Sequence, residues 1–300
     1  MNNKLPFVSI IIPVLNGERT IRACLSSILH SDYPEEQREI VVIDNGSTDR
    51  TAEIVKTFPV QYQLEARRGV SYARNRGIEA SRGGILAFTD SDCVVSRRWL
   101  LEVVQGFEDG KNGGMEGETV DYPPVTPAEH YMARRRSYSR KARLVSPLSP
   151  YVITANVAFR REVFDKIGVF DPRFPSGEDV DFSWRFFQET NFELGYNPRA
   201  IIFHRHRSTV QGFFSQHVRV GRGIAMLHAK YSSRLPWSWQ QELRAWGAVA
   251  IFAWMACRAA ICHRSLNYKR ADVYDYYFTF LRKLAVRIGF VYETLQVSQR

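Results

Sequence analysis

Short apolar runs alternate with segments of helical periodicity in the first half of the chain, and this alternation is the feature that most constrains the fold. Residues 8–12, 39–43 and 85–89 have the length and composition of buried strands. Between them, residues 19–29 carry apolar side chains at helical spacing, and residues 71–81 are predicted as a further helix. The alternation predicts an α/β protein with a mostly parallel sheet and helices on both faces.

Polar side chains follow three of these predicted strands. They are Asn16, Asp44, and the pair Asp90 and Asp92. Because the carboxyl ends of parallel strands meet at one sheet edge, where ligands bind in open α/β folds, we expect these side chains to lie together. An isolated Asp-x-Asp is more often a solvated acidic turn. Several acids around one edge instead favour a nucleotide pocket, in which Asp44 accepts from a base N–H and Asp90 accepts from ribose hydroxyls.

A divalent cation and a diphosphate fit the acidic pair. Two carboxylates one residue apart repel each other unless a cation lies between them. Hard divalent metals take carboxylate oxygens and are often completed by substrate phosphates. Arg67 and Arg74 are then expected beside the diphosphate.

The basic charge of the chain is confined to its last third. The net charge is +10, but residues 1–204 hold 26 Lys and Arg against 27 Asp and Glu, whereas residues 205–300 hold 15 against 4. Such asymmetry indicates an anionic surface as partner, either lipid head groups or nucleic acid. No nucleic-acid motif accompanies the charge, so nucleic acid is not expected. The four cysteines lack framework or Cys-x-x-Cys spacing, and the apolar run near the start lacks a cleavage site, which predicts a cytoplasmic location.

Four stretches of the first half resemble family 2 glycosyltransferases of the GT-A fold. They are Val8–Gly17, Val41–Thr51, Arg67–Gly77 and Phe88–Cys93. A dehydrogenase would instead carry Gly-x-Gly-x-x-Gly after the first strand. The resemblance implies a GT-A type, Rossmann-like sheet with a C-terminal helical tail, and Asp92 on a metal, Mn²⁺ or Mg²⁺. It assigns nucleotide binding to Pro13, Leu15, Asn16, Asp44, Gly46, Arg67, Gly69, Arg74, Asn75 and Asp90. Asn45 departs from the pattern, since many members carry a second Asp there.

The acceptor side of the predicted site is a Glu-Asp pair that opens a helix after Gly177. Acids at a helix start are favoured by the helix dipole, which is a sufficient structural reason for them. The pair also matches the family's general base, assigned to Asp179, with Glu178 on the acceptor. A base must lie within hydrogen-bond reach of the attacking hydroxyl. By the same resemblance His204, at the end of the strand over residues 200–203, is a metal ligand, with His206 as a weaker candidate.

The C-terminal part is predicted as helical and basic. Residues 208–231 form a helix in which Val220 replaces the Trp of the Gln-x-x-Arg-Trp motif of processive synthases, so one sugar per encounter is expected. The 13-residue apolar run at 245–257 is shorter than the roughly 20 residues of a spanning helix. Residues 273–295 read as an amphipathic helix that lies in a membrane interface, or as a helix packed on the catalytic domain.

These features predict a catalytic domain over residues 1–230, with a nucleotide half at about 1–110 and an acceptor half at about 111–230, and a tail over 231–300. The predicted enzyme is a metal-dependent, inverting glycosyltransferase that moves one sugar from a nucleotide-sugar donor to a glycan or lipid-linked acceptor, in cell-surface polysaccharide or glycolipid assembly. It is expected to be peripheral on the cytoplasmic membrane face. Two alternatives are a sugar nucleotidyltransferase, which would release pyrophosphate, and a non-catalytic nucleotide-sugar or glycolipid scaffold.

Overall fold

The computed structural model describes residues 5–108, 110–135, 138–262 and 270–297. By their internal packing these residues divide into two compact units. The first comprises residues 1–122, 136–172 and 178–205, and the second comprises residues 123–135, 173–177 and 206–300. All residues of the predicted site except His206 belong to the first unit.

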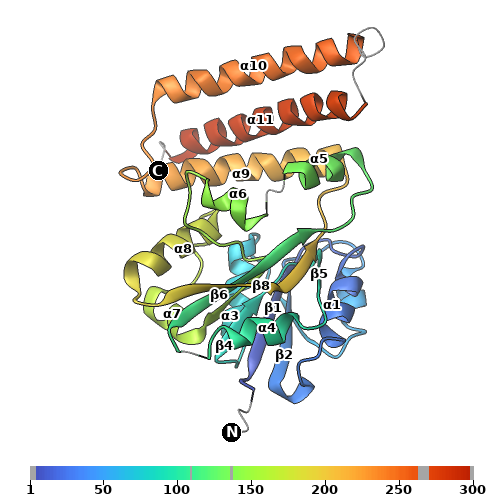
Figure 1. The fold of residues 1–300 in the computed structure, drawn as a ribbon, viewed down its shortest axis with the longest axis vertical. Coiled ribbons are helices and arrows are strands. Elements are labelled where there is room, and N and C mark those ends of the chain that lie inside the picture. Colours follow the sequence, from blue (N-terminus) through green and yellow to red (C-terminus); the bar gives the residue numbers. More distant parts are fainter. Residues whose placement is uncertain (1–4, 109, 136–137, 263–269, 298–300) are drawn as a thin grey trace. The chain divides into compact units, whose positions relative to one another are not determined.

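An eight-stranded sheet in the order β3-β2-β1-β4-β7-β6-β8-β5 forms the first unit (Figure 1). Its strands are β1 (Val8–Val14), β2 (Arg38–Asp44), β3 (Gln61–Leu64), β4 (Ile85–Phe88), β5 (Cys93–Val95), β6 (Asn112–Asp121), β7 (Val157–Arg160) and β8 (Glu193–His204). The four strands of the nucleotide half pair in parallel, as predicted. The β6–β8 pair is also parallel, but β7 runs antiparallel to both β4 and β6, and β5 runs antiparallel to β8. The sheet is therefore mixed, and each antiparallel pair includes a strand of the acceptor half.

Helices cover both faces of this sheet. They are α1 (Ile21–Leu29), α2 (Thr51–Val55), α3 (Val70–Ala80), α4 (Trp99–Gln105), α6 (Arg140–Leu144), α7 (Arg161–Ile167) and α8 (Glu178–Glu189), with a 3₁₀ turn at Glu35–Gln37. Successive residues of β1 point to opposite faces, so Ile10 and Ile12 pack in one core cluster with α1 and α4, whereas Ile11 packs in another with α7 and α8. This burial on both faces explains why the strands read as continuous apolar runs.

A cluster of phenylalanines fixes the start of α8 against the sheet. Phe182 lies 5.0 Å from Phe164 and 4.8 Å from Phe170 between ring centroids, and Phe159 lies 5.1 Å from Phe182. Aromatic pairs at these distances bury large apolar areas and restrict one another's orientation. The carboxylates that open α8 are therefore held on a rigid element.

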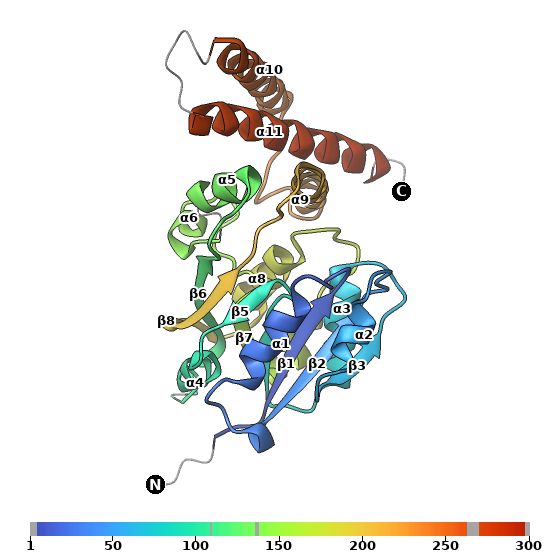
Figure 2. The same cartoon turned by 90° about the vertical axis from the view of Figure 1, so that its right-hand side faces the viewer.

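The second unit is helical and contains α5 (Pro127–Arg135), α9 (Val210–Lys230), α10 (Trp239–Cys262) and α11 (Arg270–Val297). In both views α11 lies between α9 and α10 (Figures 1 and 2). Helices α9 and α11 approach so closely that a Cβ on Gly221 or Gly289 would meet the opposing backbone at 2.0 Å. The predicted amphipathic helix is α11. By length and composition alone, residues 239–261 of α10 meet the criteria for a membrane-crossing helix, and only 11% of its most apolar window is buried.

Candidate active site

The loops after β1 and β2 are tied together by side chains from the predicted nucleotide site. Asn16 has a left-handed backbone with φ of 52°, and its Oδ1 accepts from the backbone N–H of Thr48 at 2.8 Å. Asp44, at the end of β2, is buried and accepts from the N–H of Ser47 at 2.7 Å and from the hydroxyl of Tyr62 at 3.0 Å. The polar ends of two neighbouring strands thus form one connected edge.

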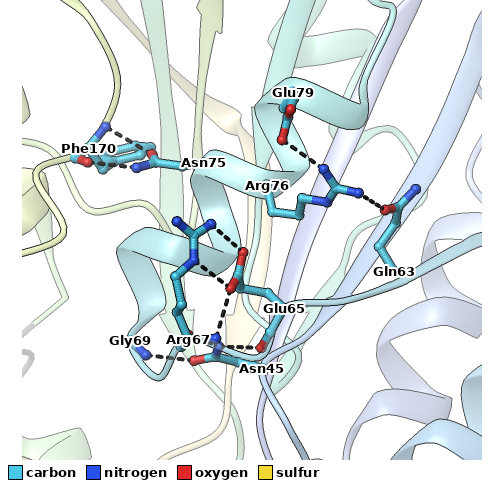
Figure 3. A network of polar contacts seen from close by, with 9 residues as sticks. All are labelled: Asn45, Gln63, Glu65, Arg67, Gly69, Asn75, Arg76, Glu79 and Phe170. Carbon is cyan, nitrogen blue, oxygen red and sulfur yellow. Dashed lines mark hydrogen bonds and ion pairs between the residues drawn. The ribbon is translucent and has the colours of Figure 1, made fainter.

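Asn45 holds the loop that carries Arg67 and Gly69 (Figure 3). Its Nδ2 donates to the carbonyl oxygens of Glu65 and Arg67, and its Oδ1 accepts from the N–H of Gly69 at 2.8 Å. A carboxylate would lack the two donors. The Asn that departs from the family pattern therefore makes contacts that the usual Asp could not make. Gly69 itself has φ of 140°, a conformation that strongly favours glycine.

The Arg67 guanidinium is exposed and forms a two-pronged ion pair with Glu65, with nitrogen–oxygen distances of 2.9 and 2.8 Å (Figure 3). These hydrogen bonds from Arg67 lower the pKa of Glu65 to about 2. Glu65 is therefore ionised at neutral pH and orients Arg67 at the rim of the edge. The predicted contact of Arg67 with a diphosphate stays a prediction.

Arg74 joins the two predicted halves of the site. Its side chain is buried on α3, with one terminal nitrogen 2.5 Å from Glu178 Oε1 and the other 3.1 Å from Asp90 Oδ1. Among the described residues, nothing accepts a hydrogen bond from its buried Nε. The guanidinium thus holds the carboxylates of Asp90 and Glu178 in one cluster, a bridge that the sequence pattern did not predict.

Asp179 has a raised proton affinity. Burial, with the negative charge of Glu178 as the second cause, raises the pKa of Asp179 to about 7, and the positive charge of Arg74 acts in the opposite direction. Its Oδ1 accepts from the N–H of Val180 at 2.9 Å. A carboxyl group that titrates near neutral pH has the proton affinity that general base catalysis favours.

Asp92 and His204 form a site that suits a divalent metal. Antiparallel pairing of β5 with β8 places Cys93 opposite His204, and Asp92 Oδ1 lies 3.4 Å from His204 Nε2. Cys93 lies in the same cluster, and burial raises the pKa of its thiol far above the usual range. A carboxylate oxygen and an imidazole nitrogen suit Mn²⁺, and the remaining positions suit phosphate oxygens and water.

The other predicted site residues have structural contacts. Asn75 uses both ends of its amide on the backbone of Phe170, donating at 2.8 Å and accepting at 3.0 Å (Figure 3). Pro13 is buried within β1, whereas Leu15 is exposed after it. Gly46 has φ of 78° and faces the guanidinium of Arg68. Their roles in nucleotide binding stay predictions, as do those of the residues above.

Two features near the site were not predicted from the sequence. Tyr138 lies 4.3 Å from His204 between ring centroids, so its ring lies against the candidate metal ligand. Glu116 on β6 is buried and pairs with the buried Arg143. The signal was present as acids in a strand and arginines in a later segment, but nothing in the sequence specified the pairing.

A mixed sheet with a carboxylate after β4, carboxylates at the start of α8, a carboxylate–imidazole pair and a polar edge after β1 and β2 is the architecture of a GT-A fold. The profile of "Glycosyl transferase family 2" matches residues 9–168, and the chain belongs to this family. It is 34% identical over 237 residues to "Glycosyltransferase AglE" of Haloferax volcanii, covering 74% of each chain. The protein is therefore a glycosyltransferase.

Other relatives and solved structures agree with this fold. The chain is 23% identical over 257 residues, 77% of each chain, to a dolichyl N-acetyl-alpha-D-glucosaminyl phosphate 3-beta-D-2,3-diacetamido-2,3-dideoxy-beta-D-glucuronosyltransferase of Methanococcus voltae. The structure of the mannosyltransferase PcManGT of Pyrobaculum calidifontis, in complex with GDP-Man and Mn²⁺, superposes with a TM-score of 0.64 at 21% identity, over 98% of this chain and 88% of that one. S. aureus TarS 1–349 with UDP-GlcNAc gives a TM-score of 0.56 at 18% identity, over 92% and 90%.

Proposed function

We propose that this glycosyltransferase moves one sugar from a nucleotide-sugar donor to a hydroxyl of a glycan or lipid-linked acceptor, with inversion at the anomeric carbon. The observation that carries the proposal is the cluster in which Arg74 joins Asp90 to Glu178, next to an Asp179 with raised pKa. The buried Arg74 guanidinium links Asp90, predicted on the donor side, to Glu178, predicted on the acceptor side. This arrangement suits two substrates that meet at one point.

In the proposed reaction Asp179 accepts the proton of the acceptor hydroxyl as its oxygen attacks the anomeric carbon. The new carbon–oxygen bond forms on the face opposite to the bond from that carbon to the phosphate oxygen, which breaks, and the nucleoside diphosphate leaves with the bonding electrons. Glu178, kept in place by Arg74, positions the acceptor. Because the reaction is a single displacement with attack opposite the leaving group, the configuration at the anomeric carbon inverts.

Asp92 and His204 would hold the divalent metal, Mn²⁺ or Mg²⁺. When bound, such an ion supplies charge neutralisation to the diphosphate oxygens. The mannosyltransferase PcManGT was solved with GDP-Man and Mn²⁺, and this supports a metal in the same fold.

The proposed location is the cytoplasmic face of a membrane, where a lipid-linked acceptor is presented. The relative from Methanococcus voltae is named for a dolichyl-phosphate-linked acceptor, which supports this class of substrate. The excess of positive charge over residues 205–300 supports an anionic surface as partner.

The test is transfer by the Asp179→Asn variant, with donor binding measured alongside. Loss of a general base lowers kcat by about 10²- to 10⁴-fold. Stabilisation by the nucleotide-sugar in the presence of Mn²⁺ should be unchanged, because Asp179 is assigned to the acceptor side. Asp165→Asn, which removes an exposed acid from α7, serves as the matched control. Near-normal transfer by Asp179→Asn would overturn the assignment, and release of pyrophosphate would identify a nucleotidyltransferase instead.

A further inference from the structure

One face of α10 is apolar along its whole length and has no covering element among the described residues. Seven side chains three or four positions apart form this face, which we term the α10 stripe: Trp239, Leu243, Trp246, Ala250, Trp254, Cys257 and Ile261. All seven are exposed, and Trp239, Leu243 and Ile261 are 72%, 70% and 80% exposed. At a rise of 1.5 Å per residue the stripe is about 33 Å long.

The opposite face of α10 is fixed against α11. Glu242 accepts from Arg287 of α11 at 2.7 Å, and the ammonium group of Lys283 lies 5.3 Å from the ring centroid of Phe252. Val249 and Ala259 are buried on the same side. The rotation of α10 about its axis is therefore set by contacts within the second unit, and the stripe lies on the exposed side of the helix.

An exposed apolar surface of this size marks an interaction site in a soluble chain. The charge around the stripe identifies the partner. Arg244 and Arg258 are exposed beside it, and the Arg258 guanidinium lies 5.3 Å from the ring centroid of Trp254. Long basic side chains beside tryptophans are typical of helices that lie between lipid head groups and acyl chains.

Three acids of the second unit form internal ion pairs, and neither Arg244 nor Arg258 is among their partners. Glu242 pairs with Arg287, Glu293 pairs with Arg222 at 2.7 Å, and Asp275 pairs with Arg134 at 2.5 Å. Two copies of the chain that met through this face would bring like charges together. An anionic lipid surface complements it instead.

The distribution of apolar residues also opposes a membrane-crossing orientation. A helix surrounded by lipid is apolar all round, whereas α10 carries Glu242, paired with Arg287, on its inner face. Crossing would separate Glu242 from Arg287 or carry both into the hydrocarbon, at a high cost for charged groups.

We infer that the α10 stripe docks on an anionic lipid bilayer, with the helix axis in the plane of the surface and its Trp rings at head-group depth. This inference rests on the proposed membrane location and not on the proposed catalytic residues. The stripe supplies apolar contact, and the flanking arginines supply attraction to anionic head groups. Through this contact the enzyme is held at the surface that presents a lipid-linked acceptor.

The experiment is co-flotation of the full-length protein with vesicles of phosphatidylcholine alone or with added phosphatidylglycerol. Binding should require the anionic lipid, weaken with salt, and fall at least about tenfold in the triple variant Leu243→Gln/Trp254→Gln/Ile261→Gln. The matched control replaces three exposed apolar residues of the first unit, as Leu64→Gln/Leu144→Gln/Val145→Gln, and should float as the wild type does. Tryptophan fluorescence should shift to the blue on binding and be quenched more by shallow than by deep brominated lipids.

Three outcomes would overturn the inference. They are equal vesicle binding by wild type and α10 variant, resistance of the bound protein to alkaline carbonate, which indicates a spanning helix, and a wild-type dimer that the α10 variant dissociates without any vesicle binding. Stabilisation of each protein by nucleotide-sugar and transfer to a soluble acceptor are measured in the same preparations. A variant that loses flotation but keeps both activities separates failure of docking from failure of the proposed catalysis.

Discussion

Arg74 on α3 donates to Glu178 at the start of α8 across 2.5 Å, although 104 residues separate them in the chain. Its second terminal nitrogen donates to Asp90 at 3.1 Å. Because this guanidinium is buried, the positions of the two carboxylates depend on each other. We therefore regard Arg74 as a residue that positions both halves of the proposed site.

Replacing Arg74 tests this role through the pH dependence of transfer. In Arg74→Gln the charge that lowers the pKa of Asp179 is removed, so the midpoint of the kcat/KM profile should move upward from about pH 7. Arg74→Lys keeps the positive charge but lacks the planar guanidinium that reaches both carboxylates. The midpoint of the pH profile should therefore stay the same while kcat/KM falls. An unshifted midpoint in folded Arg74→Gln would contradict electrostatic coupling, and thermal unfolding checks that each variant is folded.

The raised pKa of Asp179 also predicts how stability depends on pH. An unfolded Asp has a pKa of about 3.9 and the folded one a pKa of about 7, so between these values the folded state binds more protons. The free energy of unfolding contributed by this group is therefore highest below pH 4 and is lost as the pH rises to about 7. Relative to wild type, Asp179→Asn should gain about 2–3 kcal/mol as the pH rises from 5 to 8 in urea unfolding. Asp165→Asn should show no such gain.

The candidate metal ligands are tested by direct Mn²⁺ binding. Asp92→Asn and His204→Ala should each weaken Mn²⁺ affinity at least about tenfold, measured by electron paramagnetic resonance of free Mn²⁺ in the presence of nucleoside diphosphate. His30→Ala, which removes an exposed histidine of the first unit, is the control. Unchanged affinity in both variants would place the metal elsewhere.

The buried pair of Glu116 and Arg143 should matter for stability. Burial raises the pKa of Glu116 against the opposing effect of Arg143, so removing Arg143 leaves the buried carboxyl group with only the more exposed Arg140, at 3.5 Å, as a cationic partner. Arg143→Met should cost about 3–5 kcal/mol in urea unfolding. The exposed pair of Arg76 and Glu79 provides the comparison, because Arg76→Met should cost about 1 kcal/mol or less. Equal losses at the two positions would argue against a special role for the buried pair.

Asn45→Asp restores the residue that many family members carry, and we expect it to be harmful here. The carboxylate would face the carbonyl oxygens of Glu65 and Arg67 without a hydrogen to donate. The expected loss is about 1–3 kcal/mol of stability, with weaker stabilisation by nucleotide-sugars. Asn191→Asp, at an exposed position, is the control. A fully stable Asn45→Asp protein would show that the loop tolerates either residue.

Local sequence patterns were sufficient to predict the main strands of the nucleotide half. The apolar runs of β1, β2 and β4 are buried on both faces, so their composition alone marked them as strands. The acids at 90, 92, 178 and 179 and the histidine at 204 were identified because motif spacing is a property of the chain. The α10 helix was recognised only as a 13-residue apolar run, since Arg258 interrupts the run but not the stripe.

Tertiary structure alone decided which distant residues meet. The pairing of β5 with β8 brings Asp92 to His204, Arg74 reaches Glu178, and Glu116 pairs with Arg143 and Arg140. The spacing of apolar residues and the positions of turn residues predict only local structure, over a few neighbouring positions. Contacts across about 30 to 110 residues depend instead on how whole elements pack. The sequence therefore determined the class of the protein and its candidate acids, and packing of the sheet with α3 and α8 decided how they are coupled.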